Sequence, residues 1–192
     1  MTAEELQEAR VNPEFLGFLE EKEAKALESK SISELYEVLD SLLILDLDEN
    51  RIHTIYGEIL KVSFDKIEDR LKSEKKLSLD NDDIYFVRSF YEHAIEKWSM
   101  ENYAGAKELF FILSQIVEDE KFVDAANIHL LACANSTDMD TFYDKDVDHQ
   151  NEVEDEKYGY FILDFKFDTK KYLDDNILLI QEQYKNLKHL LN

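Results

Sequence analysis

The chain has 192 residues, of which 44% are hydrophobic, enough to bury a core in a single domain. Its 22 Lys and Arg against 44 Asp and Glu give a formal net charge of −22, so phosphate backbones and anionic lipid surfaces would repel it. Composition therefore excludes nucleic-acid and membrane-surface partners. The single Cys133 cannot close an internal disulfide, and no stretch has the pattern of a signal peptide or a membrane span, so we expect a cytoplasmic protein.

Only one Pro and four Gly occur, which favours long helices over a fold with many turns. We predict a mainly α protein of antiparallel helix hairpins, with a small C-terminal β-hairpin or strand and a final helix. The expected organisation is a helical hairpin array over residues 1–136, an acidic loop over 137–157, and an aromatic strand plus C-terminal helix over 158–192 that packs on the same domain.

Cap signals predict the first helices. Asn12-Pro13 can begin one helix, and Ser31 with Glu34 has capping-box spacing ahead of the next. Asp48 or Asn50 can then cap a third helix, antiparallel to the second. A separate, shorter helix is predicted to begin at Ser63, carrying the apolar residues Phe64, Ile67 and Leu71.

Two longer amphipathic helices follow a polar connection. The first predicted helix buries one face made of Ile84, Val87, Tyr91, Ala94 and Trp98. Asn102 is the expected cap of the second, which buries Tyr103, Ala106, Phe110 and Leu113. A further helix over about residues 121–135 places Phe122, Ala125, Ala126, Leu130, Cys133 and Ala134 toward the core.

The pattern changes after residue 137. Residues 138–157 hold nine Asp or Glu and two Lys, which predicts an exposed loop. Residues 158–167 are the only good strand signal, with the alternating apolar side chains Phe161, Leu163, Phe165 and Phe167. A lone strand needs a partner: either residues 141–147 form a hairpin with it, or another chain adds a strand, which leaves a homodimer open. A final helix is expected from about residue 172.

Catalytic and metal-binding patterns are weak. The five histidines are scattered, the four glycines are isolated, and Cys133 has apolar neighbours that would raise its pKa, so neither an enzyme nor a bound cofactor is expected. Asp144, Asp146 and Asp148 alternate like the start of a calcium loop. However, His149 stands at the sixth position, where such loops need Gly, and Asp155 stands at the twelfth, so we expect no metal site.

The helices instead show signs of degenerate tetratricopeptide-like repeats. Tyr103, Ala106 and Phe110 match the second helix of such a repeat, and Phe90 and Ala94 match the bulky and small positions of its first helix. Upstream, Tyr56-Gly57 resembles the bulky and small pair in the first helix of another repeat. Phe64, Ile67 and Leu71 resemble the spacing of that repeat's second helix. Ordinary helix packing could produce the same spacings.

Residues 90–134 also resemble the helical repeat core of the type III secretion chaperones that accompany translocator subunits. In that family a Y-x-x-A-x-x-x-F helix precedes a helix that ends in a small-residue motif near Cys, similar to Leu131-Ala132-Cys133-Ala134. The match covers about a quarter of the chain, which lacks the glycines common in the family. The resemblance implies a small acidic cytoplasmic chaperone or adaptor in injectisome or flagellar export.

The leading hypothesis is a non-enzymatic protein-binding module that holds another polypeptide: a secreted, flagellar or export-related subunit, or another chaperone. Its candidate framework or groove-lining residues are Tyr56, Tyr91, Trp98, Tyr103 and Phe110. The alternative is an acidic regulator that mimics nucleic acid or masks a basic protein surface. Its candidate docking residues are Asp144, Asp146, Asp148, Glu152 and Glu154. An enzyme of unknown type is a third hypothesis.

Overall fold

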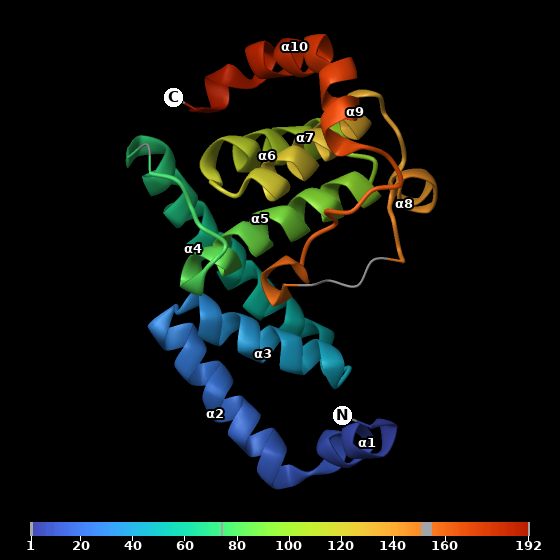
Figure 1. Ribbon diagram of the computed structural model, residues 1–192. Coiled ribbons are helices and arrows are strands. Elements are labelled where there is room, and N and C mark those ends of the chain that lie inside the picture. The colour runs from blue at the N-terminus through green and yellow to red at the C-terminus, as the bar shows by residue number, and fades with distance from the viewer. Residues whose placement is uncertain (1, 74, 151–154, 192) are drawn as a thin grey trace. The chain divides into compact units, whose positions relative to one another are not determined.

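A computed structural model describes residues 2–73, 75–150 and 155–191, and these are mainly helical (Figure 1). The chain divides into two compact units, residues 1–66 and 67–192. The helices are α1 (Ala3–Val11), α2 (Pro13–Ser29), α3 (Ile32–Ile44), α4 (Glu49–Ser73), α5 (Asn81–Ser99), α6 (Tyr103–Ile116), α7 (Glu120–Ala134), α8 (Met139–Asp146), α9 (Thr169–Asp175) and α10 (Ile177–Leu187), with short 3-10 turns at Glu156–Tyr158 and Lys188–Leu191. The predicted single array over residues 1–136 differs from this division, which falls within α4.

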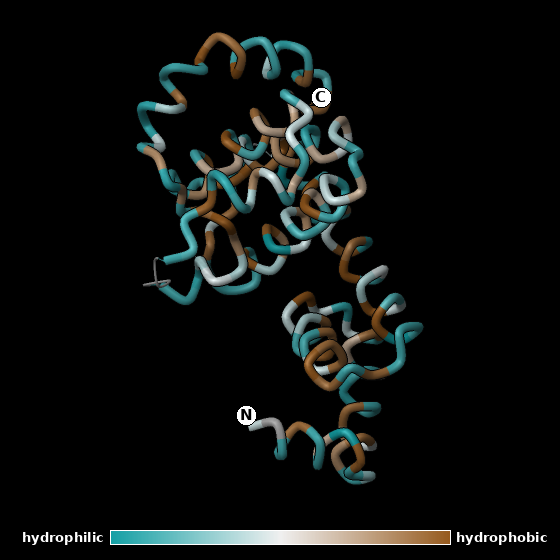
Figure 2. The backbone as a smooth tube through the Cα atoms, turned by 90° about the vertical axis from the view of Figure 1, so that its right-hand side faces the viewer, coloured by the Kyte–Doolittle hydropathy of each residue, from teal (hydrophilic) through white to brown (hydrophobic). Residues whose placement is uncertain are grey.

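In the first unit, the predicted caps are confirmed. The Asn12 side chain accepts hydrogen bonds from the backbone N–H groups of Glu14 and Phe15, so α2 begins at Pro13. Ser31 caps α3, and Asp48 caps α4. Figure 2 shows hydrophobic segments recurring along the helices with hydrophilic ones between them, as amphipathic spacing requires.

The predicted helix start at Ser63 is wrong, because α4 continues through it to Ser73. No Gly or Pro lies near this point, and Ile55, Ile59, Ser63 and Ile67 are all buried at four-residue spacing. One continuous helix keeps such a stripe on one face. Tyr56 and Phe64 therefore lie on the same helix and not on two arms of a repeat hairpin.

In the second unit, α5 and α7 end in the same kind of turn. In the first turn, Asn102 N–H donates to the Lys97 carbonyl at 2.9 Å and Glu101 has a φ of 58°. In the second, Thr137 N–H donates to the Ala132 carbonyl at 3.0 Å and Ser136 has a φ of 53°. This pairing across the helix end is the Schellman pattern, and α3 ends in the same way.

The expected C-terminal β-hairpin is not seen. Residues 161–168, which we call the extended segment, make a single antiparallel β-bridge with the described part of the chain, between Val147 and Phe165. Residues 139–146, expected as loop or strand, form α8 because the Asp138 side chain accepts a hydrogen bond from Thr141 N–H at 2.8 Å and Phe142 is buried. The alternating pattern thus predicted correctly that Phe161, Leu163 and Phe165 are buried, but the prediction that they form a paired strand is wrong.

The predicted final helix is divided into α9 and α10 at Asn176. Polar contacts fix α10 on α6 and α7. The Tyr184 hydroxyl donates to Asn127 Oδ1 of α7 at 2.8 Å and lies 3.1 Å from the Ser114 hydroxyl of α6. The C-terminal helix therefore packs on α6 and α7 within the second unit, to which the extended segment also belongs.

Candidate functional site

The extended segment lies with alternate side chains buried against the helices of the second unit. Phe161, Leu163 and Phe165 are all less than 10% exposed. The Phe161 ring makes edge contacts with Tyr91 of α5 and Phe122 of α7, with ring centres 5.2 and 4.9 Å apart. The helices thus hold an extended piece of polypeptide through apolar side chains at every second position.

Tyr91 also holds the backbone of this segment. Its hydroxyl accepts a hydrogen bond from Ile162 N–H at 3.0 Å. Burial raises the pKa of Tyr91 well above its usual range, against a smaller opposing contribution from this hydrogen bond, so the hydroxyl stays neutral. The contact supplies a partner to a backbone group that would otherwise lack one.

Asp119, the N-cap of α7, anchors the turn that precedes the extended segment. Its carboxylate accepts hydrogen bonds from Phe122 N–H at 3.0 Å, from the Tyr158 hydroxyl at 3.0 Å and from the Lys157 ammonium at 3.3 Å. Burial alone would raise the pKa of Asp119, but these bonds outweigh it and lower that pKa. One carboxylate therefore caps α7 and fixes the chain that crosses it.

Beneath the segment lies an aromatic cluster around His129, which is fully buried. The His129 ring stacks on Phe110 at 5.0 Å, and its other ring contacts are Tyr91, Trp98, Phe142 and Phe165. Neither ring nitrogen has a hydrogen-bond partner among the described residues; the Ala125 carbonyl, one turn earlier, favours the charged form without reaching hydrogen-bond geometry. Burial lowers the pKa of His129 from 6.5 to about 3, so the imidazole is neutral at pH 7.

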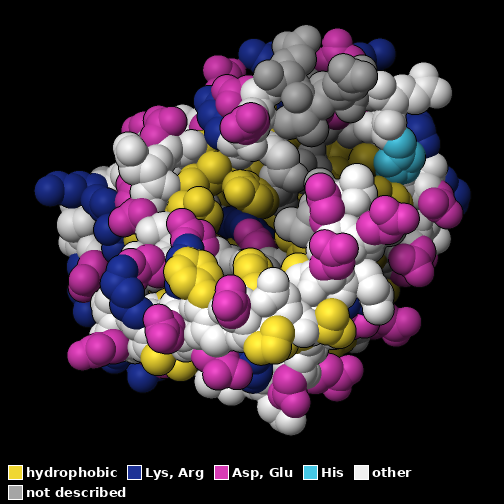
Figure 3. All heavy atoms as spheres, turned by 90° about the horizontal axis from the view of Figure 1, so that it is seen from below, with side chains coloured by type: hydrophobic (Ala, Val, Ile, Leu, Met, Phe, Trp, Pro, Cys, Tyr) yellow, Lys and Arg dark blue, Asp and Glu magenta, His cyan; other side chains and the backbone are white. Residues whose placement is uncertain are grey.

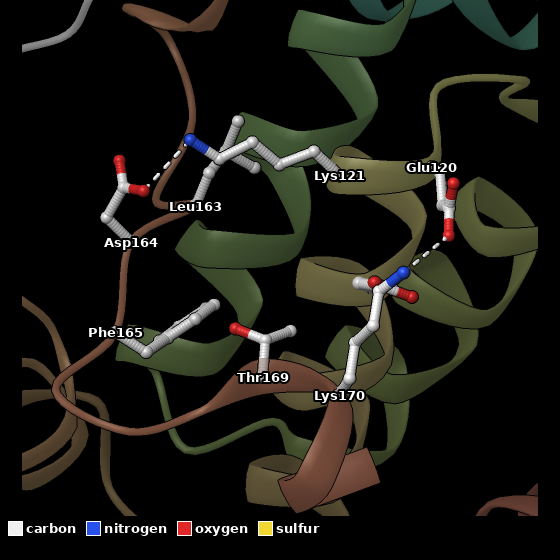
Figure 4. Close-up of a pocket in the computed structure, with 8 residues that line it drawn as sticks. Glu120, Lys121, Leu163, Asp164, Phe165, Thr169 and Lys170 are labelled. Carbon is white, nitrogen blue, oxygen red and sulfur yellow. Dashed lines mark hydrogen bonds and ion pairs between the residues drawn. The ribbon is translucent and has the colours of Figure 1, made fainter. Parts of the chain in front are cut away.

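A groove of about 380 Å³ runs between the extended segment and the beginning of α7; we call it the α7 groove. Its lining residues are Glu120, Lys121, Asp124, Leu163, Asp164, Phe165, Thr169 and Lys170. Figure 4 shows Lys121 reaching toward Asp164, and Lys170 toward Glu120. The two pairs have N···O distances of 2.9 and 3.2 Å, and buried Leu163 and Phe165 supply apolar surface between them.

The groove has one carboxylate more than it has ammonium groups. Glu120, Asp124 and Asp164 stand against Lys121 and Lys170, and Asp124 is the carboxylate without an ion pair among the described residues. Burial, then the neighbouring Glu120, raise the pKa of Asp124, with Lys170 opposing them. The environment of Asp124 would therefore favour an added cation.

The residues predicted as partner-binding lie in different places. Tyr91, Trp98 and Phe110 come together in the buried cluster as framework. There, Trp98 Nε1–H donates to the carbonyl of Thr137, in the turn after α7, at 2.8 Å. Tyr56 and Tyr103 are partly exposed, and Tyr56 belongs to the first unit. Sequence reasoning missed the groove residues, because Asp124 and Thr169 are far apart in the chain and only tertiary packing brings them together.

The structure describes three of the five predicted acidic docking residues. Asp144 and Asp146 lie on α8, Asp148 follows the bridge to the extended segment, and Glu152 and Glu154 lie outside the described residues. On the face shown in Figure 3, Asp and Glu side chains are scattered among basic and uncharged ones. Within the described ranges, no three His, Cys, Asp or Glu side chains are grouped to hold a metal ion.

Cys133 is buried on α7, and burial raises the pKa of its thiol to about 12, with Lys107 opposing only weakly. The thiolate is the nucleophilic form of cysteine, so this side chain acts as an apolar core residue at pH 7.

The comparisons with known proteins return no relative. No protein-family model matches the chain, and neither a curated protein nor a solved structure matches it. In the described part of the chain, no helix has the combination of length and apolar character that crossing a bilayer requires.

Proposed function

We propose that this protein is a non-enzymatic binding module that holds an extended segment of another polypeptide in the α7 groove. The observation that carries the proposal is the way in which α5 and α7 hold the chain's own extended segment. Alternate apolar side chains are buried, and Tyr91 accepts from the backbone N–H of Ile162. These are the two kinds of contact by which extended peptides are bound.

The α7 groove continues this surface. It has apolar walls at Leu163 and Phe165 and charged groups along its sides, and it is open to solvent between them. Pockets that bind ligands commonly combine apolar surface with a few placed polar groups. The turns that end α5 and α7 lie about 35 residues apart, close to the repeat length of about 34, which supports a tetratricopeptide-like array, a framework suited to holding peptides.

In a cell, such a module would act as a chaperone or adaptor by mass action, lowering the free concentration of its partner. The resemblance of residues 90–134 to export chaperones makes a secreted, flagellar or injectisome subunit the partner class to examine first. Cytoplasmic location is part of the same proposal.

Filling the groove should abolish partner binding. Thr169 lines the groove at the start of α9, so Thr169→Trp should block it, whereas Lys171→Trp, at an exposed position on the same helix that does not line the groove, should have little effect. The measurement is affinity capture from the native cells with the wild-type chain and both variants, at low and high salt. A partner retained by wild type and Lys171→Trp but lost by Thr169→Trp supports the proposal.

Equal retention by both variants would contradict binding in the groove. Partners that are all basic and are all lost at high salt would favour the acidic regulator instead, because exposed charge contacts weaken with salt and apolar contacts persist.

A further inference from the structure

The extended segment has one paired edge and one open edge. Asp148 N–H donates to the Asp164 carbonyl, and Lys166 N–H donates to the Asp146 carbonyl, both at 2.9 Å. Alternate residues of an extended chain direct their backbone groups to opposite sides. The N–H and C=O groups of Leu163 and Phe165 therefore point away from Val147, their neighbour across the bridge.

Within the described ranges, these groups make no hydrogen bond to another backbone group. Leu163 and Phe165 are also two of the residues that line the α7 groove. An extended segment with unpaired backbone groups is a template on which another chain can pair as a strand. The open edge and the groove are thus two properties of the same short stretch of chain.

The charges in the groove indicate which kind of segment would pair there. Lys121 and Lys170 are each within ion-pair distance of an acidic neighbour, and Asp124 is the carboxylate left over. The whole chain carries a net charge of −22, which attracts cationic segments and repels acidic ones. Leu163 and Phe165 line the groove, so apolar side chains between the cationic ones can pack on them.

We propose that the α7 groove binds a basic, extended segment of a partner protein, which adds a strand to the open edge at Leu163 and Phe165 and places a Lys or Arg against Asp124. This inference rests on the proposed function, which it deepens by naming the chemistry of the partner. The backbone pairing supplies affinity with little dependence on sequence, and Asp124 selects for positive charge.

The inference is tested with fluorescein-labelled peptides and the full chain. The basic peptide is a short one of alternating valine and lysine. The acidic comparison peptide has glutamate in place of each lysine. The basic peptide should bind and the acidic one should not, as measured by fluorescence anisotropy at low salt. Asp124→Asn should weaken binding of the basic peptide about tenfold, because a charge-assisted contact is lost. Glu108→Gln, an exposed carboxylate on α6 that does not line the groove, should leave the affinity unchanged.

Backbone pairing has its own test. The basic peptide is made in two forms, each N-methylated at alternate residues, so that each form lacks one of the two sets of N–H donors. A strand added to an edge uses only one set, so one form should lose binding and the other should keep it. Equal affinity of the two forms would overturn the pairing, and equal affinity of the basic and acidic peptides, or no binding of the basic peptide, would overturn the choice of partner chemistry.

Failure of this inference is distinguishable from failure of the proposed function. If the basic peptide does not bind but Thr169→Trp still loses a captured cellular partner, the groove binds a segment of other chemistry and only the present inference is wrong. If Thr169→Trp keeps every partner that Lys171→Trp keeps, the proposed function is wrong for this groove and the inference falls with it.

Discussion

Acidification should destabilise the second unit steeply because of His129. The unfolded chain binds a proton at this imidazole below about pH 6.5, whereas the folded chain does so only near a pKa of about 3. The stability that the neutral imidazole contributes is therefore fully present above pH 6.5 and is lost as the pH falls from 6.5 toward 3. For a fully buried ring the loss is on the order of 5 kcal/mol over the whole interval.

His129→Leu isolates this contribution. Leucine is close to histidine in volume and suits an aromatic surrounding, so the variant should be at least as stable at pH 7 and should lose much of the acid sensitivity. The measurement is urea unfolding at several pH values. Fluorescence of Trp98, the only Trp, reports on the second unit because its side chain is buried there. The control is His189→Leu, at an exposed position, which should keep the wild-type dependence of stability on pH. If His129→Leu also kept that dependence, the neutral buried imidazole would be refuted.

Enlarging Ala106 should disrupt the α5–α6 hairpin. Ala94 and Ala106 are both fully buried. The two helices are joined by the turn at residues 100–102 and pack against each other. Ala106→Phe would force extra volume into this contact, with an expected loss of about 2 to 3 kcal/mol in the free energy of unfolding.

Ala104→Phe provides the matched control, since Ala104 is exposed on the same helix. Its unfolding midpoint in urea should stay near that of the wild-type chain, while that of Ala106→Phe should fall. Wild-type stability in both variants would show that Ala106 does not set the helix spacing.

Local signals predicted most of the helices. Asn12, Ser31 and Asn102 each have a side chain that accepts from a backbone N–H near the start of the following helix, and the predicted cap positions are where those helices begin. Ser63 misled the prediction because serine is compatible both with a cap and with a helix interior. Only the stripe of buried residues on α4 distinguishes the two, and burial is a tertiary property.

The strand prediction failed in an informative way. Phe161, Leu163 and Phe165 do alternate with more exposed residues, as the sequence indicates, but the surface that buries them is helical. Periodicity of two reports an extended backbone with one buried face and does not report what covers that face. The Tyr91 hydrogen bond to Ile162 joins residues 71 positions apart, a separation that no local pattern encodes.

The α7 groove was beyond the reach of sequence reasoning for the same reason. Glu120, Lys121 and Asp124 read as ordinary exposed charges in the first turns of a helix, and Thr169 and Lys170 read as the beginning of another. Their convergence depends on Asp119, which holds Tyr158 and Lys157 against α7 and so directs the extended segment along it.

Photo-crosslinking at the groove tests the central claim most directly. A photoreactive amino acid at position 170, which lines the α7 groove, is compared in the native cells with the same amino acid at position 171, which is exposed on α9 and does not line the groove. We expect a discrete adduct to a partner polypeptide from position 170, through an extended stretch of that partner, and none from position 171. Identical adducts from both positions, or none from position 170 while the partner is still captured, would contradict binding in the groove.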